Sequence, residues 1–147
     1  MKDDEVFDVL IVDDSSENLG VTLRRQPNAH GLKFLHLHDG VEVLRYFFSK
    51  TSGRVMKAHQ SLKLILLDLK SPNTEGLDLL RKIRANEATR MIPVVMFSSS
   101  KLLMDVAEAY DLGVNSYVVK PQEHDRYVKA VADISSYWSC VNQNCGD

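Results

Sequence analysis

Short apolar runs separated by helical patterns are the main feature of the chain. Four of these runs contain hardly any polar position: Val9 to Val12, Leu64 to Leu67, Val94 to Phe97 and Tyr117 to Val119. A strand with one solvent-facing side would alternate polar and apolar residues, whereas continuous apolar runs are typical of strands buried on both faces, as in a parallel sheet. A fifth and weaker run, Lys33 to His38, predicts a strand nearer the edge of the sheet.

Helical periodicity fills the segments between these runs. Asp39 is a suitable N-cap for the second helix, and Gly113 is a typical residue at the end of the fourth. Strands and helices alternate along the whole chain, which predicts a parallel sheet covered by helices on both faces. The predicted helices are Glu17 to Gln26, Val41 to Phe48, Glu75 to Ala85, Leu103 to Leu112 and Glu123 to about Trp138.

One domain accounts for this pattern. The 147 residues contain no repeat, low-complexity tract or inter-domain linker, and this length suits a single core. We therefore predict one domain over residues 1–139 and a loose tail over 140–147, which lacks periodicity. Both cysteines, Cys140 and Cys145, fall in this tail, and no histidine or second cysteine pair lies near enough in sequence to complete a metal site.

Charge and hydropathy narrow the classes of partner. A formal net charge of −2 gives no basic stripe for nucleic acid or for an anionic membrane surface. The start of the chain is acidic and lacks the apolar segment of a secretory signal. No apolar run approaches the roughly 20 residues that span a bilayer. We expect a cytoplasmic protein with no nucleic-acid partner and no membrane partner.

Polar side chains follow four of the apolar runs directly. Asp13 and Asp14 follow the first run, and Asp68 follows the third predicted strand; Ser98 and Lys120 follow the last two. Because ligands bind at the carboxyl ends of the strands in open α/β sheets, we expect these side chains to gather at one edge. Three clustered carboxylates repel one another unless a cation lies among them, and Mg²⁺ prefers such oxygen ligands.

This group of side chains suits phosphoryl transfer. The Lys120 ammonium could pair with a phosphoryl oxygen, and the Ser98 hydroxyl could donate to another. One carboxylate would then remain as a nucleophile that forms an acyl phosphate. Asp68 is the candidate, because it stands alone after a strongly apolar run, where an unpaired buried carboxylate costs free energy. Taken singly, the other residues could be helix caps or a solvated lysine.

These residues and their intervals resemble the response-regulator receiver domain, over Phe7 to about Trp138. The matching motifs are Asp13-Asp14, Asp68 in LILLDLKSPNTEGLDLL, Ser98 in PVVMFSSS, and Lys120-Pro121 in YVVKP. The polar stretch before the third strand and the aromatic end Tyr137-Trp138 resemble the phytochrome-associated branch of single-domain regulators. The resemblance implies a flavodoxin-like doubly wound (βα)5 sandwich with the parallel strand order 2-1-3-4-5.

The resemblance also implies an acceptor and a metal site. Asp68 would accept the phosphoryl group from a sensor histidine kinase, of the phytochrome type if the branch resemblance holds. Asp14 and Asp68 would hold Mg²⁺, with Asp13 in the same metal site acting largely through water and the backbone carbonyl of Lys70 as a further ligand. At position 70 this chain has Lys, whereas the phytochrome-associated branch resembles a pattern with Asn there. The side chain at this position tends to affect how fast the phosphate is lost.

A switch is implied as well. Ser98 would sense the phosphoryl group that Lys120 contacts, and Tyr117 would turn inward as Ser98 moves, although a strand tyrosine is also an ordinary packing residue. Pro121 suggests a cis peptide bond. The face of the fourth helix, fifth strand and fifth helix would then change for a downstream protein, a phosphotransfer partner or a second copy of the chain. We expect no output domain after Trp138, and no enzyme activity beyond the domain's own phosphorylation and dephosphorylation.

Three rival interpretations remain open. A haloacid-dehalogenase-type phosphohydrolase would also use an Asp nucleophile and Mg²⁺, but it would normally carry a second Asp where this chain has Lys70. A receiver fold that binds partners without phosphate would not need the complete acceptor set. A flavin protein would need a phosphate-binding loop after the first strand, where the sequence from Asp13 to Glu17 is too acidic. His36 and His38 share a strand face, but no third metal ligand is evident.

Overall fold

Five parallel strands form a single sheet at the centre of the computed structural model, which describes residues 6–15, 19–49, 61–68 and 74–145. The strand order is β2-β1-β3-β4-β5, with every neighbouring pair parallel. The predicted strand order is therefore confirmed. The strands are β1 (Val9–Asp13), β2 (Phe34–Leu37), β3 (Leu64–Asp68), β4 (Val94–Ser98) and β5 (Ser116–Val119).

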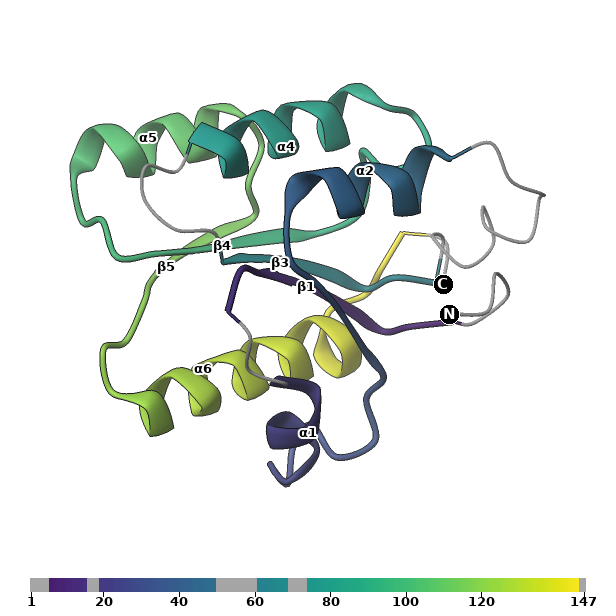
Figure 1. The fold of residues 1–147 in the computed structure, drawn as a ribbon, viewed down its shortest axis with the longest axis vertical. Helices are drawn as coiled ribbons and strands as arrows, with labels where there is room; N and C mark the ends of the chain where they lie inside the picture. The colour runs from purple at the N-terminus through teal and green to yellow at the C-terminus, as the bar shows by residue number, and fades with distance from the viewer. Residues whose placement is uncertain (1–5, 16–18, 50–60, 69–73, 146–147) are drawn as a thin grey trace.

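Helices cover both faces of this sheet. Figure 1 shows α2, α4 and α5 on one side and α1 and α6 on the other, which gives the three layers of a doubly wound sandwich. The helices are α1 (Leu19–Arg24), α2 (Gly40–Phe48), α4 (Thr74–Ala85), α5 (Leu103–Asp111) and α6 (His124–Ser136), and a π-helical turn η1 (Tyr137–Val141) follows α6.

The helix ends follow the predicted signals in most places. The Asp39 side chain accepts a hydrogen bond from the Glu42 backbone N–H, as an N-cap residue does. The first helix ends at Arg24, before the predicted end at Gln26, because the Gln26 N–H bonds to the Leu23 carbonyl in a tighter turn. The π-helical turn includes Cys140 and Val141, the first two residues after the predicted domain end at 139.

The burial of the strands agrees with their apolar patterns. Every residue of β1, β3 and β4 is buried, as expected for strands covered on both faces. The edge strand β2 alternates between buried and half-buried positions, and the edge strand β5 is half-buried to exposed. Alternate residues of each strand enter two separate cores, because side chains along a strand point to opposite faces.

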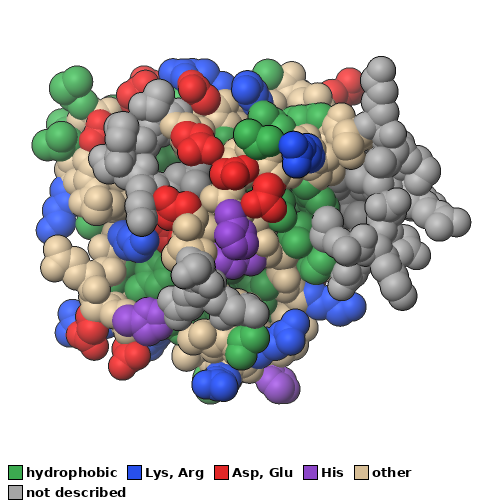
Figure 2. All heavy atoms as spheres, in the orientation of Figure 1, with side chains coloured by type: hydrophobic (Ala, Val, Ile, Leu, Met, Phe, Trp, Pro, Cys, Tyr) green, Lys and Arg blue, Asp and Glu red, His purple; other side chains and the backbone are tan. Residues whose placement is uncertain are grey.

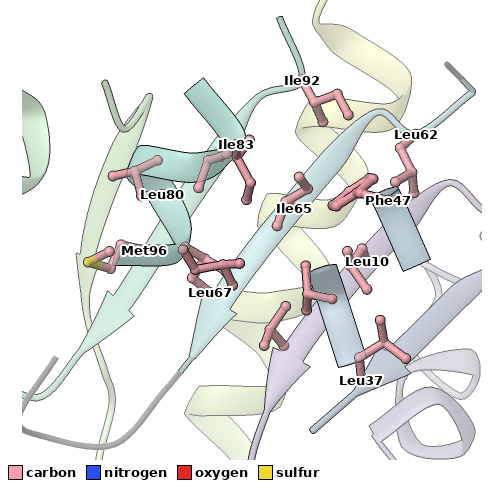
Figure 3. Packing of buried hydrophobic residues seen from close by; sticks show 14 of the residues in the cluster. Leu10, Leu37, Phe47, Leu62, Ile65, Leu67, Leu80, Ile83, Ile92 and Met96 are labelled. Carbon is pink, nitrogen blue, oxygen red and sulfur yellow. The ribbon is translucent and has the colours of Figure 1, made fainter. Parts of the chain in front are cut away.

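The two cores pack against different helices. One lies under α2 and α4, and Figure 3 shows its members Leu10, Leu37, Phe47, Leu62, Ile65, Leu67, Leu80, Ile83, Ile92 and Met96. The other lies against α1 and α6 and includes Val9, Ile11, Leu19, Leu23, Leu66, Phe97, Tyr127 and Val131. The predicted stripe of the last helix thus faces the second core, with Ile134 and Trp138 partly buried against it.

The surface carries side chains of both charges. Figure 2 shows acidic and basic side chains interspersed on the face turned to the viewer, as a net charge of −2 leads one to expect. Within the described ranges, none of the helices combines the length and the apolar character that a membrane span requires.

Arg84, near the end of α4, fastens the loops that lead into β4 and β5. Its guanidinium donates to the carbonyls of Gly113, Arg90 and Ile92 at 2.9, 3.0 and 2.8 Å. It also donates to Asn115 Oδ1 at 2.8 Å, and the same oxygen accepts the Val94 N–H. One half-buried side chain therefore holds two connections at the amino ends of the strands.

Gly113→Ala is expected to destabilise the domain by about 1–2 kcal/mol. Gly113 has a φ of +100°, which L side chains rarely adopt, and an added Cβ would lie 3.1 Å from Arg84 Nε. Gly31→Ala is the matched control, because nothing lies within 4 Å of the Cβ position there. Urea unfolding midpoints measure both effects, and equal midpoints for the two variants would contradict the prediction.

Candidate functional site

The carboxyl ends of β1, β3, β4 and β5 bring four of the predicted site residues to one edge of the sheet. Asp13 and Asp68 are register partners in the β1–β3 pair, and both are almost fully buried. Ser98 ends β4, and its carbonyl accepts the Lys120 N–H at 2.7 Å. The fold thus places two carboxylates, a hydroxyl and an ammonium next to one another.

Asp68 has a donor on each carboxylate oxygen. Lys120 Nζ lies 3.0 Å from Oδ1, and the Tyr127 hydroxyl lies 2.5 Å from Oδ2. Asp68 itself is 3% exposed, whereas the Lys120 side chain is 37% exposed. The buried carboxylate is therefore held between one partly hydrated cation and one buried phenol.

The environment of Asp68 disfavours its charged form. Burial raises the pKa of this carboxyl above its ordinary value, and the nearby charge of Asp13 acts in the same direction. The hydrogen bonds from Tyr127 and Lys120, together with the Lys120 charge, oppose the rise without cancelling it. A buried carboxylate with a perturbed pKa at a strand end is typical of a functional site.

Asp13 is bound by the turn that follows β1. Its carboxylate accepts hydrogen bonds from the Ser15 N–H at 3.1 Å and the Ser15 hydroxyl at 2.9 Å. His36 Nε2 lies 3.0 Å from the Asp13 carbonyl and 4.0 Å from its carboxylate. The His36 ring stacks on His38 with centroids 4.7 Å apart, so the histidine pair packs beside the site.

Asp14 is exposed, unlike Asp13. In the part of the chain that the structure describes, no three His, Cys, Asp or Glu side chains are grouped so that they could hold a metal ion. Two of the three predicted carboxylates therefore come together in buried positions, and the third does not join them there. Lys70, predicted to supply a backbone carbonyl, lies outside the described residues.

Hydrogen bonds connect Ser98 to Tyr117 through the loop after β4. Ser98 Oγ accepts the Ser100 N–H at 3.1 Å, and the Ser100 carbonyl accepts the Tyr117 hydroxyl at 3.0 Å. Tyr117 is half-buried and packs against the core under α2 and α4. In this conformation its hydroxyl is thus bonded to the same loop that Ser98 begins.

Tyr127 is a site residue that the sequence interpretation missed. The helical stripe assigned it to the core, and its ring does pack there, edge-on to Phe97 with centroids 5.9 Å apart. Its hydroxyl, however, reaches Asp68, and Lys120 Nζ lies 5.0 Å from the ring centroid. A buried tyrosine usually has a partner for its hydroxyl, and this general rule is the signal that could have identified it.

A small open pocket lies beside Asp68. Its volume is about 180 Å³. The residues that line it are Asp13, Ser15, Lys120, Pro121, Gln122, His124 and Tyr127. Both donors to Asp68 therefore border a space that opens to solvent.

Comparison with known proteins decides the family. The model of the response regulator receiver domain matches residues 9–132, which include every described residue of this site. The chain belongs to the response regulator receiver family. As a receiver domain it is a signalling domain of two-component systems.

The receiver domain spans most of the length of two regulatory relatives. It is 30% identical to the probable methanogenesis regulatory protein FilR2 of Methanothrix harundinacea, covering 97% of this chain and 90% of the relative. It is 32% identical to response regulator Rcp1 of Synechocystis, covering 88% and 87%.

Two solved structures are similar as well. The Mn²⁺-bound form of Rcp1 superposes with a TM-score of 0.72 at 27% identity, over 95% of this chain and 99% of that one. The bacteriophytochrome response regulator RtBRR has a TM-score of 0.61 at 33% identity, over 97% and 86%.

Proposed function

We propose that this receiver domain is a phosphorylation switch in which a histidine kinase transfers a phosphoryl group to Asp68. The observation that carries the proposal is the position of Asp68, which is buried at a strand end between Lys120 and Tyr127 and faces Asp13 in the neighbouring strand. A carboxylate so placed has two uses: it can bind a cation, or it can act as a nucleophile.

A divalent cation fits this site by the chemistry of its donors. Asp13 and Asp68 supply oxygen ligands, and the repulsion between them is a reason for a cation to bind. Rcp1, a relative with a similar fold, has been solved with Mn²⁺. In our proposal Mg²⁺ is held by Asp13, Asp14, Asp68 and the backbone carbonyl of Lys70, and when bound it neutralises charge on the carboxylates and the phosphoryl oxygens.

The chain's own residues supply position and charge for the transfer. One Asp68 oxygen forms a bond to phosphorus as the bond between phosphorus and the donor's imidazole nitrogen breaks, and the electron pair stays on that nitrogen. Lys120, already 3.0 Å from Asp68, follows the negative charge to a phosphoryl oxygen. Ser98, at the end of the adjacent strand, donates its hydroxyl to another.

The signal would leave through the face of α5, β5 and α6. Movement of Ser98 toward a phosphoryl group would disturb its bond to the Ser100 N–H and thereby the Tyr117 contact. The start of α5 is exposed and apolar at Leu102, Leu103 and Met104, which suits a protein partner. That partner would be a downstream protein, a phosphotransfer protein or a second copy of the chain. The bacteriophytochrome regulator among the similar structures favours a phytochrome-type kinase.

The test is the intact mass of the protein after incubation with Mg²⁺ and a small-molecule acyl phosphate. We expect one phosphoryl group on the parent and none on Asp68→Asn, or on the parent without Mg²⁺, because the proposal places the acyl phosphate on the Asp68 carboxylate. If the phosphorylated form is too short-lived to be measured, beryllofluoride, a stable mimic of the phosphoryl group, is used in its place.

Two outcomes would contradict the proposal. If neither the acyl phosphate nor beryllofluoride changes the mass or the melting temperature of the parent, the domain binds its partners independently of phosphorylation. If the protein turns over free phosphomonoesters, it is a phosphohydrolase of the rival type instead.

A further inference from the structure

The hydroxyl of Tyr127 is bonded to an oxygen of Asp68, the carboxylate that the proposed function uses as phosphoacceptor. Asp68 has two oxygens, and Tyr127 donates to Oδ2 while Lys120 donates to Oδ1. Because Asp68 is 3% exposed, few directions remain from which another group could approach either oxygen. Any ligand of Asp68 therefore has to share or replace one of these two donors.

Packing fixes the phenol where it is. Tyr127 is 7% exposed, and its ring lies edge-on to Phe97 within the core under α1 and α6. It follows α6 residues that are exposed, so the ring is the first buried side chain of that helix. The hydroxyl is thus presented to Asp68 by the core and not by a mobile surface side chain.

The same residue borders the space that a ligand would enter. Tyr127 lines the open pocket of about 180 Å³ together with Asp13 and Lys120. A cation that binds Asp13 and Asp68 has to approach through the polar groups of this edge, and a hydroxyl hydrogen directed at Asp68 Oδ2 repels it. The Tyr127 hydroxyl and a bound cation would each interact with the same negative charge on Asp68.

We propose that Tyr127 is a positioning residue that competes with the divalent cation for Asp68 and satisfies this carboxylate when no cation is bound. The inference rests on the proposed function, since it requires a cation at Asp68. It predicts that the chain binds the cation less tightly than the same site would without the hydroxyl. It also predicts that the hydroxyl contributes to stability mainly in the cation-free domain.

The experiment measures melting temperatures of the parent and Tyr127→Phe over a titration with Mn²⁺. The Phe variant keeps the ring against Phe97 and removes only the donor. Without Mn²⁺ we expect it to melt about 3–6 °C below the parent, because a buried carboxylate oxygen loses its hydrogen bond. With saturating Mn²⁺ the two melting temperatures should converge, and the apparent affinity of the variant should be about tenfold higher.

Two further variants make the result specific. Tyr110→Phe removes a hydroxyl that accepts the Tyr117 N–H and does not contact Asp68, so any loss should be the same with and without Mn²⁺. Asp68→Asn removes the partner of both donor and cation, so its melting temperature should not respond to Mn²⁺. If Tyr127→Phe does not fold, Tyr127→Leu also lacks the hydroxyl and is titrated in its place.

The outcomes separate the inference from the proposed function. An equal loss of stability with and without Mn²⁺, or an affinity that is unchanged or lower in Tyr127→Phe, would overturn the competition while leaving a parent that binds the cation. A parent that shows no response to Mn²⁺ would instead remove the cation site from the proposed function and the inference with it. Converging melting temperatures and tighter binding would establish the competition.

Discussion

Phe97→Ala should destabilise the domain by about 3–5 kcal/mol, the usual cost of truncating a fully buried aromatic residue. Phe97 has no exposed surface and is the largest of the fully buried side chains. It lies in β4 next to Ser98 and supports the ring of Tyr127. The cavity left by the truncation would therefore lie directly behind the site, and Tyr127 would lose the contact that directs its hydroxyl to Asp68.

Urea unfolding followed by circular dichroism measures this effect. Phe48→Ala is a suitable control, since Phe48 is only partly buried at the end of α2 and packs on the other core. We expect the loss for Phe48→Ala to be less than half of that for Phe97→Ala. Similar losses would show that the second core closes around the cavity, and would contradict the central role given to Phe97.

Asp68→Asn is expected to stabilise the domain by about 1–2 kcal/mol at neutral pH, while it abolishes phosphorylation. Burial makes the charged form of Asp68 unfavourable, and an amide of the same shape carries no charge to bury. Lys120 would lose its partner, but its side chain is more than one-third exposed and can be hydrated instead. If Asp68 is the acceptor as proposed, stability is given up at this position to keep its carboxylate.

The pH dependence of this difference reports on Asp68 alone. The pKa of Asp68 is raised by folding, so the folded domain binds this proton more tightly than the unfolded chain does. The stability that the protonated carboxyl gives is complete below the ordinary aspartate pKa and is lost as the pH rises through the raised value. The difference between Asp68→Asn and the parent should therefore be small in acid, grow with pH and then level off.

Unfolding free energies of both proteins from about pH 4 to pH 8 measure this curve. A difference that is independent of pH, or an Asn variant less stable than the parent at neutral pH, would mean that the hydrogen bonds from Lys120 and Tyr127 outweigh the cost of burial.

The sequence allowed the fold to be predicted because its central strands carry no polar residue before their last position. Uninterrupted runs such as Leu64 to Leu67 are typical of strands covered on both faces. The placement of Asp68, Ser98 and Lys120 at one edge of the sheet was predictable for the same reason, since each comes directly after such a run. The position of each residue along its strand also fixed the edge at which they meet.

Other features depend on directions that a linear pattern does not contain. Neighbouring residues at a strand end point to opposite sides, so Asp13 faces Asp68 while Asp14 is exposed. Tyr127 falls in an apolar helical stripe, and only the packing of its ring determines that its hydroxyl reaches Asp68. The early end of α1 reflects a local turn at Gln26 that periodicity does not mark.

The hydrogen bonds of Arg84 hold the amino ends of β4 and β5 to one helix. At their amino ends, the connections through Gly113, Ile92 and Asn115 are anchored to α4 by a single guanidinium. At their carboxyl ends lie Ser98 and Lys120, and Lys120 is bonded directly to Asp68. We expect the amino ends to keep their positions and the strand register to stay unchanged when a ligand binds at Asp68, so that any displacement is confined to the segments 99–102 and 120–123.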